Sequence, residues 1–175
     1  MSKAWSTTTA IAAVMGIAPW AVFLGGLAKL TDVLTDFNLS QALKQTVIML
    51  EWYILSAQLA VLLLAVIIAA GNGLRRAHTL LNMFLAVNTA LLILRATVRL
   101  WQINRYQDGE EVGPLLGVAN ISGNPLPYLR ALAAGLVSTA TWNFVLAIVV
   151  GLAGTTALPE HVKASHYKPG APIAA

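Results

Sequence analysis

The sequence predicts an all-α integral membrane protein with four transmembrane helices packed as an antiparallel bundle. Two observations predict this class. The 175-residue chain is 58% hydrophobic and only 10% charged, whereas roughly a quarter of the residues of a soluble domain are charged. Four segments also each hold the ~20 predominantly apolar residues that a helix needs to cross a hydrocarbon core of ~30 Å. A lipid bilayer is therefore the expected solvent of most of the chain.

The four apolar segments define the expected spans. They cover residues 6–28, 47–70, 79–101 and 129–153. Each is expected to be helical, because a lipid-exposed strand would leave its backbone N–H and C=O groups unpaired. Together they predict one transmembrane domain over residues 1–157. The polar, proline-rich residues 158–175 are expected to form a flexible cytoplasmic tail.

The first apolar segment raises the alternative of a secretory signal peptide, because a lysine precedes it. The apolar run extends from about Trp5 to Leu30, longer than the roughly 7–15 residues of a signal-peptide core. We therefore expect a retained first span. Pro19 removes a backbone donor and is expected to kink this helix, with Gly16 adding local freedom.

The three connections between the spans differ in character. Gly71, Asn72 and Gly73 open the connection 71–78 and are expected to end one helix and fold the next one back against it. Residues 31–46 are mildly amphipathic, which predicts a short interfacial helix in the first outer loop. The last connection holds a stretch rich in Gly and Pro, residues 113–127, that is not expected to be regular helix.

The charges of the connections predict the orientation of the chain. The basic residues that decide it are Lys3, Arg75, Arg76, Lys163 and Lys168. Because loops rich in Lys and Arg stay in the cytoplasm, both termini and the 71–78 turn are predicted there, and the first and third connections outside. The two N-x-[ST] sequons agree with this orientation, since Asn38 and Asn120 lie in the predicted outer loops and are candidate glycosylation sites.

Charged residues inside the spans are the sharpest candidates for a site. Glu51 lies a few residues inside the outer end of the second span. A charged side chain costs ~2.5–3.5 kcal/mol at the centre of a membrane-spanning helix, so its depth and its partners matter. If the hairpin centres on residue 74, Glu51 lies 74 − 51 = 23 positions before the centre, and its mirror position is 74 + 23 = 97. Arg95 and Arg99 flank that position and can share one helix face. We predict a structural ion pair of Glu51 with both arginines near the outer leaflet.

Two alternatives to this ion pair remain open at the level of sequence. Arg99 is close enough to the interface to snorkel toward the headgroups beside Trp101, a typical interfacial anchor. The two arginines are alternatively a site for a substrate or an ion. Of the pair, we expect Arg95 to reach Glu51 across the hairpin and Arg99 to lean toward the headgroups.

Four uncharged polar residues lie within the spans: Gln58, Asn82, Asn88 and Asn143. In lipid such side chains usually form hydrogen bonds between helices, each typically contributing less than ~2 kcal/mol. We expect them to be packing contacts of this kind. The alternative is that they line a polar pathway through the membrane.

The sequence predicts no catalytic residue, no metal site and no cofactor. Cysteine is absent, and the three histidines lie at 78, 161 and 166, none of them deep in a span, which argues against haem and zinc ligation. No nucleophile has a neighbouring base, and no phosphate-binding glycine loop is present. The formal net charge of +4 is scattered, so no nucleic-acid partner is expected.

The layout of four spans with cytoplasmic termini resembles several tetraspan families, in topology alone. Claudins, tetraspanins and connexins rely on cysteines in their outer loops, and this chain has none. CASP-like proteins carry an Arg in the first span and an Asp in the third, whereas here the first span has no charge and the third has Arg95. No residue pattern is specific to MARVEL-type proteins, so the sequence assigns the chain to none of these families.

The expected function is non-enzymatic. We expect a tetraspan membrane protein that acts as a scaffold, a membrane organiser or an accessory subunit of a larger membrane complex. Its expected partners are the lipid bilayer and other membrane proteins or further copies of itself. The alternative is a small oligomeric channel or transporter, with polar residues of spans two to four lining the path, and a weaker third is a protein that binds lipid or pigment. Deep Asn and Gln side chains that face inward favour the first role, and side chains that line a water-filled route favour the second.

Overall fold

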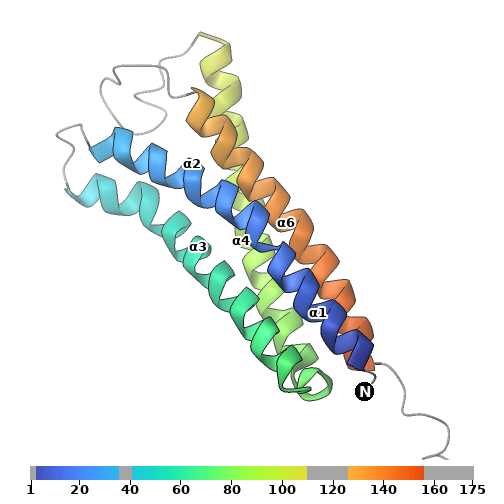
Figure 1. The fold of residues 1–175 in the computed structure, drawn as a ribbon. Helices are drawn as coiled ribbons and strands as arrows, with labels where there is room; N and C mark the ends of the chain where they lie inside the picture. The colour runs from blue at the N-terminus through green and yellow to red at the C-terminus, as the bar shows by residue number, and fades with distance from the viewer. Residues whose placement is uncertain (1–2, 36–40, 110–125, 156–175) are drawn as a thin grey trace, which may run out of the picture.

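The computed structural model describes residues 3–35, 41–109 and 126–155, and these residues are helical apart from short turns. The helices form an elongated bundle (Figure 1): α1 (Lys3–Met15), α2 (Ile17–Thr35), α3 (Gln41–Ala70), α4 (Leu74–Gln107) and α6 (Leu126–Thr155). Since α1 runs almost directly into α2, the described residues contain four helical segments that are long and apolar enough to cross a membrane. The expected helical class and the four segments of spanning length are confirmed.

The helices differ from the expected spans at their ends. Helix α4 has 34 residues, which is about 51 Å at 1.5 Å per residue, and it continues beyond the expected end at 101. The connection 31–46 holds no separate interfacial helix in its described residues, because 31–35 complete α2 and 41–46 begin α3. Residues 36–40 lie outside the described residues. The turn expected over 71–78 is confined to 71–73, since α4 begins at Leu74.

The first span is interrupted at Gly16, between α1 and α2. Pro19 has no N–H to donate to the carbonyl of Met15, and its ring crowds that carbonyl. The N–H of Gly16 still donates to the carbonyl of Ala12 at 3.2 Å, so the regular pattern stops just after this bond. The interruption therefore lies nearly one turn before Pro19, the residue expected to kink this helix.

The turn between α3 and α4 is a Schellman motif. Asn72 adopts a positive φ of 55°, a conformation that Asn tolerates better than most residues other than Gly. Its N–H donates to the carbonyl of Ala69 at 3.1 Å, and the N–H of Gly73 donates to the carbonyl of Ile68 at 2.9 Å. These two bonds satisfy carbonyls at the end of α3. The chain can therefore start α4 immediately afterwards, at Leu74.

Helices α2 and α6 approach each other closely because two glycines lie at their contact. A Cβ atom added at Gly26 would be 2.7 Å from the Cα atom of Leu132, and one added at Gly135 would be 2.5 Å from the Cα atom of Phe23. No side chain fits at either position without moving a helix. Small residues permit such backbone contact between transmembrane helices.

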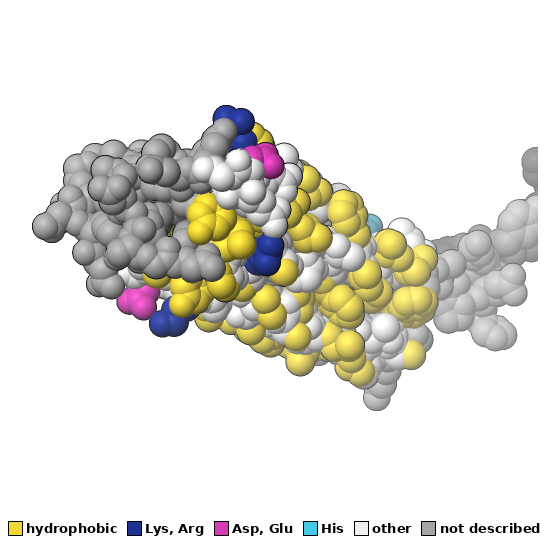
Figure 2. Space-filling view, turned by 90° about the horizontal axis from the view of Figure 1, so that it is seen from above, with side chains coloured by type: hydrophobic (Ala, Val, Ile, Leu, Met, Phe, Trp, Pro, Cys, Tyr) yellow, Lys and Arg dark blue, Asp and Glu magenta, His cyan; other side chains and the backbone are white. Residues whose placement is uncertain are grey.

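The outer surface of the bundle is largely apolar. Large hydrophobic side chains are exposed on every described helix, and they cover most of the described face in Figure 2, where Lys, Arg, Asp and Glu lie toward one end. The interior holds two clusters of buried apolar side chains, one around Phe23, Leu92 and Leu136 and the other around Leu62, Leu85 and Leu146. Buried polar side chains lie along the same interior and form the candidate site.

Candidate functional site

Two sets of polar side chains lie inside the bundle. The first, called here the ion-pair cluster, consists of Glu51, Arg95, Arg99 and Gln102. The second, called the amide cluster, consists of Gln58, Asn88 and Asn143. Each set connects α3 to at least one other helix. Six of the seven residues are buried, and Arg95 is half-buried.

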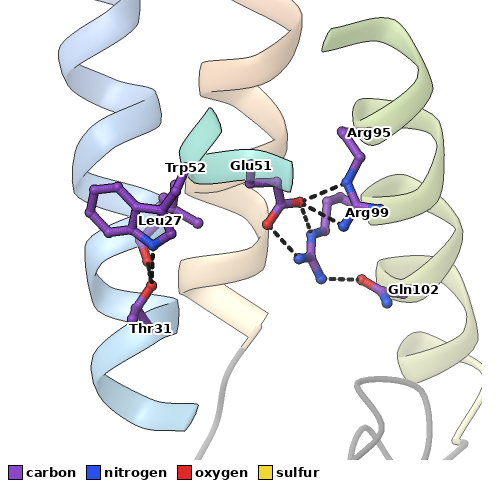
Figure 3. A network of polar contacts seen from close by, with 7 residues as sticks. All are labelled: Leu27, Thr31, Glu51, Trp52, Arg95, Arg99 and Gln102. Atoms are coloured by element: carbon purple, nitrogen blue, oxygen red, sulfur yellow. Dashed lines mark hydrogen bonds and ion pairs between the residues drawn. The ribbon is translucent and has the colours of Figure 1, made fainter. Parts of the chain in front are cut away.

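The ion-pair cluster joins α3 to α4 through the carboxylate of Glu51, as Figure 3 shows. Arg99 binds this carboxylate with two nitrogens, because its Nη2 donates to Oε2 at 2.7 Å and its Nε donates to Oε1 at 2.8 Å. Arg95 donates to Oε1 from Nε at 3.2 Å and from Nη2 at 3.1 Å. The carboxylate therefore accepts four hydrogen bonds from two guanidinium groups, and the structure brings together all three residues that the hairpin geometry selected.

The expected roles of the two arginines are reversed in one respect. Arg99, expected to lean toward the headgroups, has a fully buried side chain, whereas the side chain of Arg95 is 17% exposed. The Nη1 atom of Arg99 also donates to Oε1 of Gln102 at 2.7 Å. The physical reason is that α4 does not end at 101. Its continuation carries Gln102, to which Arg99 donates, and Ile103, which is buried in the same apolar cluster as Leu129 at the start of α6.

The charges of the ion-pair cluster do not cancel. Glu51, Arg95 and Arg99 together carry a formal charge of 2 − 1 = +1. A buried ion pair is stable only when its geometry is good and further hydrogen bonds satisfy the remaining donors and acceptors. The two-nitrogen contact with Arg99 and the bond to Gln102 provide such geometry. The cluster is therefore suited to hold α3 against α4 in one arrangement.

A neutral contact ties α3 to α2 beside the ion-pair cluster (Figure 3). The indole N–H of Trp52 donates to Oγ1 of Thr31 at 3.2 Å. The hydroxyl of Thr31 donates in turn to the carbonyl of Leu27 at 2.7 Å. Glu51 and Trp52 are adjacent in sequence, so consecutive residues of α3 contact α4 and α2.

The amide cluster joins α3, α4 and α6. Gln58 and Asn143 form a reciprocal pair, with Nε2 of Gln58 donating to Oδ1 of Asn143 at 2.6 Å and Nδ2 of Asn143 donating to Oε1 of Gln58 at 2.9 Å. Nδ2 of Asn88 donates to the same Oε1 atom of Gln58. Each of the three amides is buried and bonds to another member of the set. Their polar groups are thus directed toward one another, inside the bundle.

Asn82, the fourth predicted polar contact, is not joined to the amide cluster. It lies on an open groove of about 280 Å³ between α4 and α6, whose lining includes Ala90, Phe144 and also Asn143 of the amide cluster. Its Oδ1 atom is buried and has no hydrogen-bond partner among the described residues. The candidate glycosylation sites Asn38 and Asn120 lie outside the described residues.

Two deep tryptophans, expected from their depth to contact the bundle or a partner, make hydrogen bonds between helices whose acceptors the sequence did not identify. The indole N–H of Trp20 in α2 donates to the carbonyl of Leu55 in α3 at 3.0 Å. The indole N–H of Trp142 in α6 donates to the carbonyl of Ala12 in α1 at 2.8 Å. The available signal was their depth in apolar segments, since a buried indole N–H usually finds a hydrogen-bond acceptor. Gln102 also lacked an assigned role, although it lies three residues after Arg99, at the spacing of facing residues on a helix.

The chemistry of these clusters is that of helix attachment: ion pairing and amide hydrogen bonding between helices. Within the described residues, no group of three or more His, Cys, Asp or Glu side chains is placed to hold a metal ion. Comparison with known proteins gives no match to the chain among family models, curated proteins or solved structures.

Proposed function

We propose that the chain is a multi-pass membrane protein whose four spans form an antiparallel bundle, and that it acts without enzymatic activity as a scaffold, membrane organiser or accessory subunit of a larger membrane complex. The observation that supports this role is the inward direction of the deep amides. Gln58, Asn88 and Asn143 bond to one another across three helices. Polar side chains used in this way hold helices together.

The same observation weighs against the alternative of a channel or transporter. A water-filled path needs polar groups that face the path and exchange partners with water or a substrate. Here Oε1 of Gln58 already accepts two hydrogen bonds, and Glu51 accepts four. The remaining polar candidate, Asn82, lies on a largely apolar groove at the surface of the bundle. A bundle with an apolar exterior fits contact with lipid and with other membrane proteins.

The orientation is part of the proposal, with both termini and the 71–73 turn in the cytoplasm. The absence of cysteine from the chain allows a direct test with single introduced cysteines. A membrane-impermeant maleimide added to intact cells should label Gly117→Cys and leave Asn72→Cys unlabelled until the membrane is opened. Labelling of Asn72→Cys alone in intact cells would show the opposite orientation and would contradict this part of the proposal.

The accessory role is tested by purifying the full chain from its native membrane in a mild detergent and sizing it by native electrophoresis. The proposal expects other membrane proteins to co-purify in fixed ratio, in a particle much larger than the chain alone. A parallel sample in dodecyl sulfate should release them. A uniform oligomer of this chain alone, with ion flux after reconstitution into liposomes, would contradict the proposal and establish the channel alternative.

A further inference from the structure

The turn between α3 and α4 is bordered by a basic hollow. This hollow has a volume of about 490 Å³ and is lined by Gly71, Asn72, Gly73, Arg75 and Arg76. It lies where α3 ends and α4 begins, which in the proposed membrane insertion is the level of the membrane–water interface. We call it the turn hollow.

The two arginines of the turn hollow are the reason to regard it as a binding site. Arg75 and Arg76 are both exposed. Neither guanidinium makes an ion pair or a side-chain hydrogen bond within the described part of the chain, whereas Arg95 and Arg99 both bind Glu51. A guanidinium presents a planar fork of donors that matches the oxygens of a phosphate. Two such forks at one hollow favour an anionic ligand with several oxygens.

A second hollow of different character shares Asn72 with the first. It has a volume of about 310 Å³ and lies between α1 and α3, where its lining includes Ala10, Ala69 and Ala70 together with Ser6 and Thr7. The hydroxyl of Ser6 is already used, since it donates to the carbonyl of Ala69. This alanine hollow therefore offers mainly small apolar groups beside the basic one.

We infer that the two hollows together bind one anionic phospholipid, with its phosphate at Arg75 and Arg76 and the start of its acyl region against Ala10, Ala69 and Ala70. The charge of the turn hollow complements the phosphate, and the apolar lining of the alanine hollow complements the adjoining hydrocarbon. A free phosphate would occupy the turn hollow alone, because it has no hydrocarbon to place in the alanine hollow. The inference goes beyond the accessory role and rests on the membrane insertion that is part of it.

The test measures lipid retention by native mass spectrometry of the purified full chain in detergent. The protein is incubated with an equimolar mixture of phosphatidylglycerol and phosphatidylcholine with the same acyl chains. The wild-type chain should retain phosphatidylglycerol preferentially. The variant R75Q/R76Q should bind it about 30-fold more weakly, which follows from ~1 kcal/mol for each basic residue near a lipid surface and 1.4 kcal/mol for each factor of ten.

The matched control is R130Q. Arg130 is likewise exposed and has no ion-pair partner in the described residues, but it lies at the start of α6, at the opposite end of the bundle. This variant should retain phosphatidylglycerol like the wild type. An equal loss in R130Q would show a general effect of surface charge and would overturn the site, as would an unchanged preference in R75Q/R76Q.

The variant A70L separates a lipid from a free phosphate. Ala70 is exposed, so a leucine there should fill the alanine hollow without disturbing the core, and unchanged thermal unfolding would verify this. Lipid retention should fall although both arginines are present, and millimolar inorganic phosphate should not displace the lipid. Unchanged retention in A70L, or displacement by phosphate, would overturn the inference. No partner protein is needed, so the lipid site and the accessory role can fail separately.

Discussion

Replacing Glu51 with Gln should strongly destabilise the bundle. Glutamine nearly preserves the shape and one acceptor oxygen, but it exchanges the carboxylate charge for an amide. One of its terminal atoms becomes a donor, facing guanidinium donors that now lie 2.7–3.2 Å from the carboxylate. The formal charge of the three side chains rises from +1 to +2 with Arg99 fully buried. We expect E51Q to lower the free energy of unfolding by about 3–5 kcal/mol, the cost of removing one partner of a buried ion pair.

The assay is a dodecyl sulfate titration of the full chain in mixed micelles, followed by tryptophan fluorescence. The matched control is D32N, which removes the ion pair between Lys29 and Asp32. That pair has an N–O distance of 3.3 Å, but its side chains are 62% and 66% exposed, so D32N should cost less than ~1 kcal/mol. A double variant, E51Q/R99Q, should recover part of the loss because it also removes the buried positive charge.

The comparison between these variants can refute the reasoning. If E51Q destabilises the chain no more than D32N, the carboxylate does not hold α3 against α4. If R99Q destabilises E51Q by as much as it destabilises the wild type, the two residues are not energetically coupled.

Four further variants test the packing by the same titration. G135A should lower the free energy of unfolding by more than ~2 kcal/mol, because its Cβ atom would lie 2.5 Å from the Cα atom of Phe23. Its control is G25A, whose Cβ atom would meet open space and which should leave stability unchanged or raise it by up to ~1 kcal/mol. Equal effects of the two variants would contradict the close α2–α6 contact. Q58L should cost about 1–3 kcal/mol because it leaves buried amides of Asn88 and Asn143 without a partner, and a neutral result would mean that water reaches them. W142F should cost about 1 kcal/mol by removing the bond to Ala12, and an unchanged stability would show that this bond contributes nothing.

The ion-pair cluster shows how far sequence reasoning reaches in this chain. Hydropathy locates the four long apolar segments because each must hold enough apolar residues to cross a bilayer. The tight turn then fixes the register of the hairpin formed by α3 and α4, and this register places Glu51 opposite residue 97. The structure does bring Glu51 to Arg95 and Arg99, since a short turn leaves little freedom in the pairing of two long helices.

The burial of Arg99 and its bond to Gln102 could not be predicted from the register of the hairpin. Trp101 is typical of an interface, so the sequence suggested that the helix ends there. The actual length of α4 depends on tertiary packing, because Ile103 is buried in a cluster that also contains Leu129 of α6. This packing involves residues that are far apart in the chain, so a local sequence pattern does not predict it.

The uncharged polar residues illustrate the same limit. Gln58, Asn88, Asn143 and Asn82 look alike in the sequence, each a single amide within an apolar segment. Which of them meet depends on how each helix is rotated about its axis. Three of them bond to one another in the amide cluster, and Asn82, which lines the same α4–α6 groove as Asn143, is not joined to them.

The most direct test of the central claim is the accessibility of the interior to water. Single cysteines introduced as Thr139→Cys and Asn88→Cys probe two buried positions of α6 and α4, and Asn72→Cys, on the exposed turn, provides the reference. In opened membranes a small water-soluble thiol reagent should modify Asn72→Cys rapidly and the two interior cysteines at least a hundredfold more slowly. Interior cysteines that react as fast as the turn would reveal a water-filled route along the amide cluster and would contradict the account.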